Sequence, residues 1–259
     1  MPELPEVEGV VNALKPVVTG KTIEEVTLSQ VLEESRKAGK QAIIKGTELA
    51  HFQQELADAK IIQIVRRSKY IYFHLEKNHQ SKLLVNHLGM SGAWFYVHET
   101  HEISEEKFRK HIHVIFKLND GMLLVYADIR RFGEMRLLES EEQFPPLLLM
   151  APEPFDDSAL YHFLDLTKLV KYQNKSIKEV IMDGQVISGC GNIYATEALF
   201  RMHIHPARKV SSISQKRLTE IFETVVVVLN ESILVGGSSI SDYRNINGEA
   251  GGMQHRLQM

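Results

Sequence analysis

Cysteine is almost absent from this sequence, in which Cys190 is the only one among 259 residues. A single cysteine excludes an internal disulfide framework and a structural zinc site built from cysteine ligands. The sequence also lacks an apolar run of about 18 residues, the length of a membrane span, and it lacks the charged and apolar start of a signal peptide. These absences predict a cytoplasmic protein with no membrane association.

A surplus of positive charge is also missing, because the formal net charge is -3. A protein held on nucleic acid by charge alone carries a basic surplus, so this net charge argues against a protein of that kind. The local field depends on how charges are distributed, however, and two basic clusters stand out at residues 66–69 and 130–131. A local basic groove therefore remains compatible with the composition.

The periodicity of the sequence changes near residue 140, and its length suffices for one large or two medium domains. A helix at about residues 5–14 precedes short β-rich runs, which are typical of an antiparallel sandwich or barrel. Proline-rich residues then precede helical periodicity. We expect an α+β fold with domains at 1–140 and 141–259. The expected strands are 23–28, 61–65, 70–75, 82–87, 93–97, 111–118 and 122–126, and the expected later helices are 158–171, 176–182, 192–202 and 214–234.

The first eight residues permit two interpretations. If Met1 is removed, the Pro2 nitrogen becomes a secondary amine, and an α-amino group with a pKa of about 7.7–8.0 is partly an unprotonated nucleophile near neutral pH. Glu3 is adjacent and can exchange protons with the group that the amine attacks. Alternatively, the segment is only a helix start, with proline in the first turn and Glu6 near the positive end of the helix.

Residues 188–194 form a glycine-rich turn that opens a predicted helix. Free backbone amides at such a position can hold a phosphate, but an ordinary tight turn between two helices explains the pattern equally well. Cys190 within this turn is typical of a small buried residue rather than of a nucleophile.

Two further turns follow predicted strands, at residues 87–92 and 128–133. Met90 in the first is either core filler or an exposed wedge, which fills the gap left when a base leaves the DNA stack. Arg130 and Phe132 in the second suit contact with a DNA groove and insertion between bases, and a salt-bridged strand end is the alternative.

Two His-x-His pairs raise the question of a metal site. Strand alternation places His111 and His113 on the same face. No HExxH motif and no third ligand at a suggestive spacing accompanies either pair, so we predict no metal site.

Several motifs in a fixed order resemble the bacterial formamidopyrimidine-DNA glycosylase family over essentially the whole chain. They are Pro-Glu-Leu-Pro-Glu-Val-Glu at 2–8, Arg-Arg-Ser-Lys-Tyr at 66–70, His-Leu-Gly-Met-Ser-Gly at 87–92, Asp-Ile-Arg-Arg-Phe-Gly at 128–133, Ala-Pro-Glu-Pro at 151–154 and Gly-Asn-Ile-Tyr-Ala at 191–195. The resemblance implies an N-terminal β-sandwich followed by a helix–two-turns–helix domain, with damaged double-stranded DNA bound between them by a monomer. It also implies a bifunctional enzyme, a glycosylase and AP lyase that removes oxidised purines such as 8-oxoguanine and formamidopyrimidines.

The resemblance implies a role for each matched residue. Pro2 would attack C1′ of the damaged nucleotide and form a Schiff base that leads to β- and δ-elimination. Glu3 would protonate the sugar ring oxygen, and Glu6 would orient the N-terminus. The residues expected to hold phosphates are Lys69, His87, Lys178 and Asn192. Lys69 is also expected to belong to the catalytic group. Those expected to fill the vacated stack are Met90, Arg130 and Phe132, and those expected in a lesion-capping loop are Ser238, Ile240, Asp242 and Tyr243.

The sequence departs from the family's pattern in one respect. The four cysteines of the zinc finger that members usually carry do not exist in this sequence, so we expect no zinc and no other cofactor. Loss of a phosphate contact from that finger predicts weak DNA binding. Alternatives are a catalytically impaired DNA-binding module, in which the finger is missing or Met1 is retained, a glycosylase for oxidised pyrimidines, and a metal-dependent hydrolase.

Overall fold

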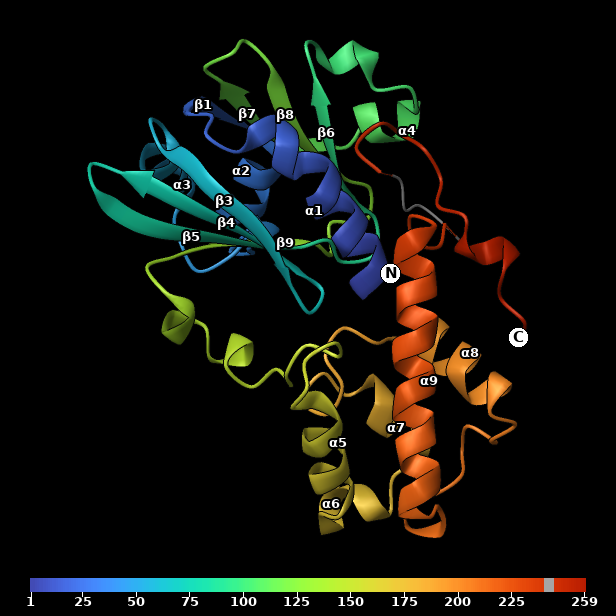
Figure 1. Cartoon of the computed structure of the whole chain (residues 1–259). Helices are drawn as coiled ribbons and strands as arrows, with labels where there is room; N and C mark the ends of the chain where they lie inside the picture. Colours follow the sequence, from blue (N-terminus) through green and yellow to red (C-terminus); the bar gives the residue numbers. More distant parts are fainter. Residues whose placement is uncertain (240–244) are drawn as a thin grey trace.

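Two β-sheets packed face to face form the first half of the chain in this computed structural model, which describes residues 1–239 and 245–259 (Figure 1). All neighbouring strands are antiparallel except β2 and β9, which are parallel. One sheet has the order β1 (Ile23–Leu28), β7 (Ile112–Leu118), β8 (Leu123–Asp128) and β6 (Gly92–Val97). The other has the order β2 (Ile43–Ile44), β9 (Glu134–Leu138), β5 (Gln80–His87), β4 (Tyr70–Lys77) and β3 (Lys60–Arg67).

Apolar side chains that alternate along the strands fill the space between the sheets. Trp94 lies at the centre, in contact with the rings of Phe73, Phe116 and Tyr126, which come from both sheets. The indole N–H of Trp94 donates to Asn86 at 2.8 Å, so its polar atom is satisfied within the core.

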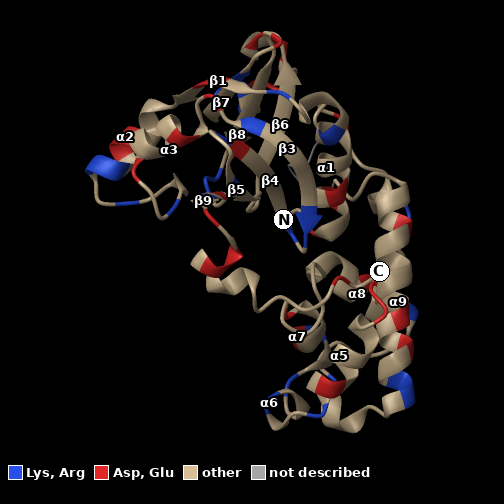
Figure 2. Cartoon of the chain, turned by 60° about the vertical axis from the view of Figure 1, so that its left-hand side comes forward, with Lys and Arg blue, Asp and Glu red and all other residues tan. Residues whose placement is uncertain are grey.

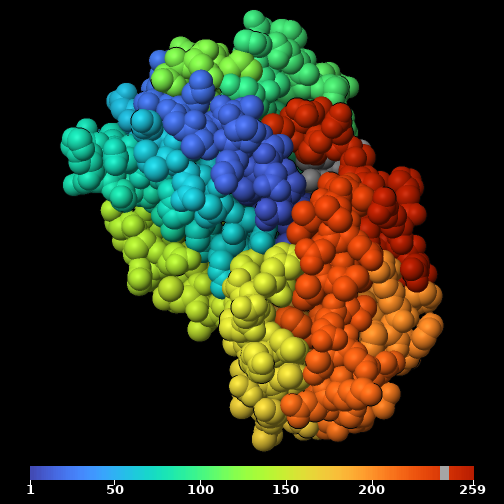
Figure 3. Space-filling model, viewed as in Figure 1, coloured from blue at the N-terminus to red at the C-terminus, as the bar shows by residue number. Residues whose placement is uncertain are grey.

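Helix α1 (Leu4–Val18) joins the two halves of the molecule. Val7, Val10 and Leu14 pack into the core of the sandwich, whereas Leu4 belongs to the core of the helical half. The helix also lies against α9, as the blue and orange surfaces show in Figure 3. The N-terminus is therefore fixed at the junction between the two halves.

The second half of the chain is helical, and its helices enclose a hydrophobic core separate from that of the sandwich. No helix in the described part of the chain is long and apolar enough to cross a membrane. The expected helix at 158–171 is two helices, because the extended backbone of Leu169 (φ -70°, ψ 138°) interrupts the helical hydrogen bonds. The helices are α5 (Ala159–Thr167), α6 (Val170–Gln173), α7 (Ile177–Met182), α8 (Asn192–Arg201) and α9 (Gln215–Leu234).

Several elements were not expected from the sequence, namely β2, β9 and three helices. Helix α2 (Gln30–Lys37) buries only Leu32, so it has no apolar face for periodicity to reveal. Strand β7 begins after His111, so the two histidines of that pair do not share a strand. The other unexpected helices are α3 (Leu49–Leu56) and α4 (Glu106–Arg109), and single 3₁₀ turns lie at Thr100–Glu102, Glu141–Gln143, Pro145–Leu147, Val210–Ser212 and Met253–His255.

Glu153 ties the segment between β9 and α5 to the end of β3. Its carboxylate accepts from Arg67 at 2.8 Å and from the Ser68 amide at 2.7 Å, and it pairs with Arg66 at 2.5 Å. Burial works to raise the pKa of Glu153, but the charge of Arg66 and these hydrogen bonds outweigh it and hold the pKa below its usual value.

Replacing Glu153 by alanine is expected to lower the free energy of unfolding by about 2 kcal/mol, because it leaves partly buried guanidinium groups without their main partner. Urea unfolding of Glu153→Ala measures this loss. Asp165→Ala, which breaks the exposed pair with Lys168, is the control and is expected to cost less than about 0.5 kcal/mol. Equal losses in both variants would contradict the expectation.

Candidate functional site

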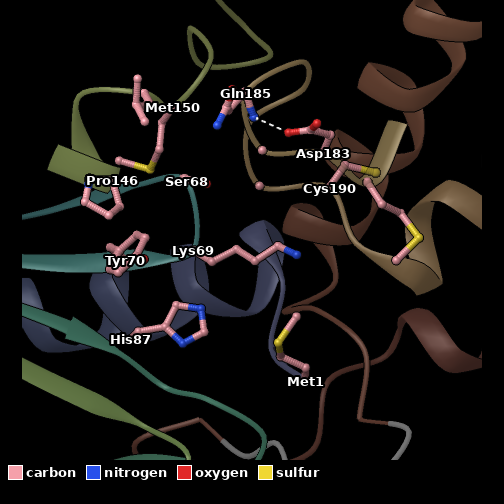
Figure 4. A pocket seen from close by; sticks show the side chains of 14 residues that line it. Met1, Ser68, Lys69, Tyr70, His87, Pro146, Met150, Asp183, Gln185 and Cys190 are labelled. Atoms are coloured by element: carbon pink, nitrogen blue, oxygen red, sulfur yellow. Dashed lines mark hydrogen bonds between the residues drawn. The ribbon is translucent and has the colours of Figure 1, made fainter. Parts of the chain in front are cut away.

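The N-terminus lies between two pockets of about 480 Å³ each, which share Met1, Lys69 and Met182 in their walls. The first, which we call the proline pocket, is lined by Met1, Pro2, Glu3, Lys69, Met90, Met182, Gly191, Asn192, Ile193 and Ser238. The second, the linker pocket, lies on the side of the segment between β9 and α5, and Figure 4 shows Lys69 and Met1 reaching into it.

Pro2 is buried in the wall of the proline pocket, while Met1 is 43% exposed. With Met1 present, the Pro2 nitrogen is part of an amide and has no free lone pair. Because the Met1 side chain is accessible, its removal needs no opening of the core and would place a secondary amine in the pocket.

Glu3 is held by the amides that open helix α8. The Gly191 N–H donates to one carboxylate oxygen at 2.7 Å, and the Ile193 N–H donates to the other at 2.9 Å. The free amides of the turn at 188–194 thus bind a side chain of this chain, and the phosphate site that the turn pattern permits stays a prediction. Burial raises the pKa of Glu3, against the charge of Lys69 and the amide hydrogen bonds, so Glu3 retains a proton more readily than an exposed carboxyl group.

The absence of a side chain at Gly191 leaves room for the close approach of Glu3 and Lys69. A Cβ atom at Gly191 would lie 2.5 Å from the Glu3 carboxyl carbon and 2.8 Å from the Lys69 Nζ. The glycine of the Gly-Asn-Ile-Tyr motif is therefore a sequence signal for this contact.

Glu6 connects α1 to α8 and to the segment that follows α9. One oxygen accepts from the Glu3 N–H at 2.7 Å, and the other accepts from the Ser238 N–H at 2.7 Å and from the Tyr194 hydroxyl. Tyr194 also bonds to the Ser232 hydroxyl at 2.6 Å. Burial raises the pKa of Glu6 to about 7, although these hydrogen bonds oppose the shift. Sequence reasoning assigned no role to Tyr194 or Ser232, because nothing local connects them to Glu6.

Lys69 lies in the tight turn between β3 and β4. Ser68 has a positive φ of 55° there, and its N–H is fixed by Glu153. The Lys69 side chain extends from this turn into the space between the two pockets (Figure 4). Its charge therefore acts on both Glu3 and His87.

His87 ends β5 and lines the linker pocket. Its Nδ1 accepts from the Gly89 N–H at 3.0 Å, and its ring lies 5.0 Å from that of Tyr70. Burial, together with the charge of Lys69, lowers the pKa of His87 to about 4. The imidazole is therefore neutral at pH 7, and Nε2 carries its proton.

The turns at 87–92 and 128–133 touch each other, since a Cβ atom at Gly89 would lie 2.4 Å from the Phe132 carbonyl carbon. The buried Asp128 organises both turns, because its carboxylate accepts from Ser91 at 2.7 Å and from the Gly133 amide at 2.8 Å. Phe132 remains 59% exposed, with the Arg130 guanidinium 5.0 Å from its ring centre.

Met90 is half-buried and lines the proline pocket, so it is not core filler. Arg130 forms no ion pair with any described residue, which argues against a salt-bridged strand end. The structure thus brings Met90, Arg130 and Phe132 onto one pair of adjoining turns.

Only some of the other predicted residues lie in the walls of the two pockets. Asn192, the first residue of α8, and Ser238 both line the proline pocket. Lys178 lies on α7 but lines neither of the two pockets. The predicted loop residues Ile240, Asp242 and Tyr243 lie outside the described residues.

A zinc site of four thiolates does not fit these residues. The only cysteine, Cys190, is buried, and burial raises the pKa of its thiol. His113 bonds to Ser29 and to the Asp128 carbonyl, whereas His111 faces the Lys107 carbonyl. Within residues 1–239 and 245–259, no three His, Cys, Asp or Glu side chains are grouped so that they could hold a metal ion. We therefore derive no chemical step through a metal.

Comparison with protein families gives two matches along the chain. The model described as Formamidopyrimidine-DNA glycosylase N-terminal domain matches residues 1–135. The model described as Formamidopyrimidine-DNA glycosylase H2TH domain matches residues 150–244.

Individual relatives agree with the family models. Formamidopyrimidine-DNA glycosylase of Bacillus cereus is 37% identical over 262 residues, covering 100% of this chain and 87% of the relative. The protein of that name from Exiguobacterium sp. is 38% identical over 259 residues, covering 99% and 87%.

Solved structures share the architecture. Lactococcus lactis Fpg in complex with DNA containing an abasic site has a TM-score of 0.81 at 29% identity, covering 99% of this chain and 87% of that chain. The MutM (Fpg) protein from Thermus thermophilus has a TM-score of 0.79 at 29% identity, covering 99% and 86%. The expected α+β fold with a helix–two-turns–helix domain is confirmed.

Proposed function

The chain belongs to the formamidopyrimidine-DNA glycosylase family, and from that membership and the geometry around Pro2 we propose that it removes oxidised purines from double-stranded DNA and then cleaves the strand. One observation carries the chemistry of this proposal. Pro2 lines a pocket beside Glu3, whose carboxyl group is fixed by two backbone amides and has a raised pKa.

The first step uses Pro2 as a nucleophile once Met1 has been removed. Its nitrogen attacks C1′ of the flipped nucleotide, the bond from C1′ to the base breaks, and the base leaves with a proton. Glu3 protonates the sugar ring oxygen as the ring opens, and the C1′–nitrogen bond becomes an iminium. The raised pKa of Glu3 favours this role, because an acid must still hold its proton near neutral pH.

The second step cleaves the strand. The iminium withdraws electrons from C2′, so that loss of a C2′ proton to the Glu3 carboxylate expels the 3′ phosphate in a β-elimination. A second proton loss expels the 5′ phosphate in a δ-elimination. Glu6 holds the Glu3 N–H and so keeps the amine and the acid in one arrangement.

The residues around the pocket supply the DNA contacts in this proposal. Lys69, His87, Asn192 and Lys178 would hold phosphates near the extruded nucleotide. Met90, Arg130 and Phe132 would enter the vacated stack, and flipping costs a few kcal/mol that such insertion offsets.

Two substitutions are expected to separate charged from neutral phosphate contacts. Lys178→Ala removes a cation, so the slope of log Kobs against log salt is expected to become smaller by about 0.9. His87→Ala removes a neutral donor, because the pKa of His87 is about 4, and is expected to weaken binding without changing the slope. Fluorescence anisotropy with an abasic-analogue duplex measures both. A smaller slope for His87→Ala would show that this histidine binds as a cation.

A panel of lesion duplexes tests the proposed substrate. We expect the processed protein to excise 8-oxoguanine and formamidopyrimidine in single turnovers and to be trapped on them by borohydride. Faster excision of oxidised pyrimidines would overturn the purine assignment. Binding without excision or trapping, by protein shown by intact mass to lack Met1, would overturn the catalytic assignment.

A further inference from the structure

A second basic hollow lies outside the two pockets, between helix α2 and the turn that carries Phe132. We call it the α2 groove. It has a volume of about 540 Å³, and its charged lining consists of Lys40, Lys45, Arg130, Arg131 and Glu34. Figure 2 marks Lys and Arg positions in blue at the end of α2 and in the segment that follows it.

Hydrogen bonds hold the loop after α2 in one shape. Arg36 donates to the Ile44 carbonyl at 2.8 Å and to the Thr47 carbonyl at 2.6 Å. The Ala42 N–H donates to the Ser35 hydroxyl at 3.2 Å, and the backbone N–H at position 45 donates to the Met135 carbonyl at 2.9 Å. The lysines of this loop therefore project from a backbone fixed to both α2 and β9, which lowers the ordering entropy that binding must overcome.

The cations of the α2 groove lack acidic partners. Lys40, Lys45, Arg130 and Arg131 form no ion pair with any residue of the described ranges, and the single carboxylate, Glu34, accepts from the Gln30 amide at 2.8 Å. Elsewhere on the surface, Lys21, Lys82 and Lys110 each pair with a carboxylate. Four unpaired cations around one hollow are thus a local concentration of positive charge in a chain of net charge -3.

We propose that the α2 groove binds the phosphodiester backbone of the duplex beside the flipped nucleotide. The proposal rests on the proposed function. Arg130 and Arg131 line the groove and belong to the same turn as the exposed Phe132, so a duplex that receives Phe132 brings its backbone to the groove. The contact is to phosphates alone, so it raises affinity for any sequence and takes no part in the chemistry.

A double variant, Lys40→Ser/Lys45→Ser, tests the proposal with Lys15→Ser/Lys216→Ser as the matched control. The control lysines are exposed and do not line the groove. Loss of two phosphate contacts is expected to make the salt slope smaller by about 1.8, so the gain in affinity between about 200 and 50 mM salt falls roughly tenfold. The salt slope of the control variant is expected to stay unchanged. The single-turnover excision rate at saturating protein is also expected to stay unchanged.

The duplex should extend a full helical turn, about 10 base pairs, on each side of an abasic analogue. An unchanged slope for the groove variant, or equal changes in both variants, would overturn the proposal. The slope is measured on binding alone, so it remains interpretable if no excision occurs, and failure of the proposed function would appear separately in the excision assay.

Discussion

Chains that retain Met1 are expected to give no borohydride-trapped complex with an 8-oxoguanine duplex, whereas chains that begin at Pro2 are expected to give one. The reason is covalent. An amide nitrogen has its lone pair delocalised into the carbonyl group, whereas a free α-amine has a pKa of about 7.7–8.0 and is partly unprotonated near neutral pH. The loss of trapping is therefore complete rather than partial.

Intact mass of each preparation gives the fraction of chains without Met1, and the trapped fraction at saturating duplex should follow it. Treatment of a Met1-containing preparation with an aminopeptidase is the matched control, because the same protein should gain trapping as it loses one methionine. Met1 is 43% exposed, so the enzyme can reach it without unfolding. Trapping by chains shown to retain Met1 would remove Pro2 as the nucleophile.

Processing also changes the shape of the site. Met1 lines both the proline pocket and the linker pocket, so its removal enlarges the free space of both. Under the proposed function, removal of Met1 therefore frees the amine and makes room beside it in the same event. Duplex binding without chemistry should persist in unprocessed protein, since the exposed Phe132 and the basic groups lie on other elements.

Sequence patterns predicted the elements that local periodicity determines. The strand expected at 23–28 is β1, and the helix expected at 214–234 is α9. Helix α1 is longer at both ends than expected, because its Leu4 and Val18 are fixed by packing that no local pattern shows. Helix α2 was missed for the opposite reason, since it buries a single side chain.

The candidate site divides in the same way. Six of the residues selected from motifs lie together in the wall of the proline pocket: Pro2, Glu3, Lys69, Met90, Asn192 and Ser238. The contacts that hold them join distant positions, since the bond from Tyr194 to Glu6 spans 188 residues and that from Ser68 to Glu153 spans 85. A single sequence contains no information on which distant positions meet in space, so it predicts the types of residue in the site but not their partners.

Replacing Glu3 by glutamine is expected to lower the single-turnover excision rate by about 10²–10⁴-fold, the range of a lost general acid. The amide has no proton to give to the ring oxygen, and its NH₂ group would face the N–H of Gly191 or Ile193, so one amide hydrogen bond is lost as well. Glu8→Gln is the matched control. Glu8 lies on α1, the helix that Glu3 precedes, pairs with Arg66 and does not line the proline pocket, so the rate of this variant should change little.

The pH profile separates the acid from a merely structural role. A carboxyl group with a raised pKa is protonated to a higher pH than usual, so the competent form of Glu3 is lost as pH rises through that pKa. The Pro2 amine works in the opposite direction, because it becomes a nucleophile as pH rises toward about 7.7–8.0. The wild-type profile should therefore be bell-shaped, and Glu3→Gln should keep the rising limb and lose the falling one. A Glu3→Gln profile that is slower but still bell-shaped would assign the acid to another group, and Glu6, with a pKa of about 7, is the nearest candidate.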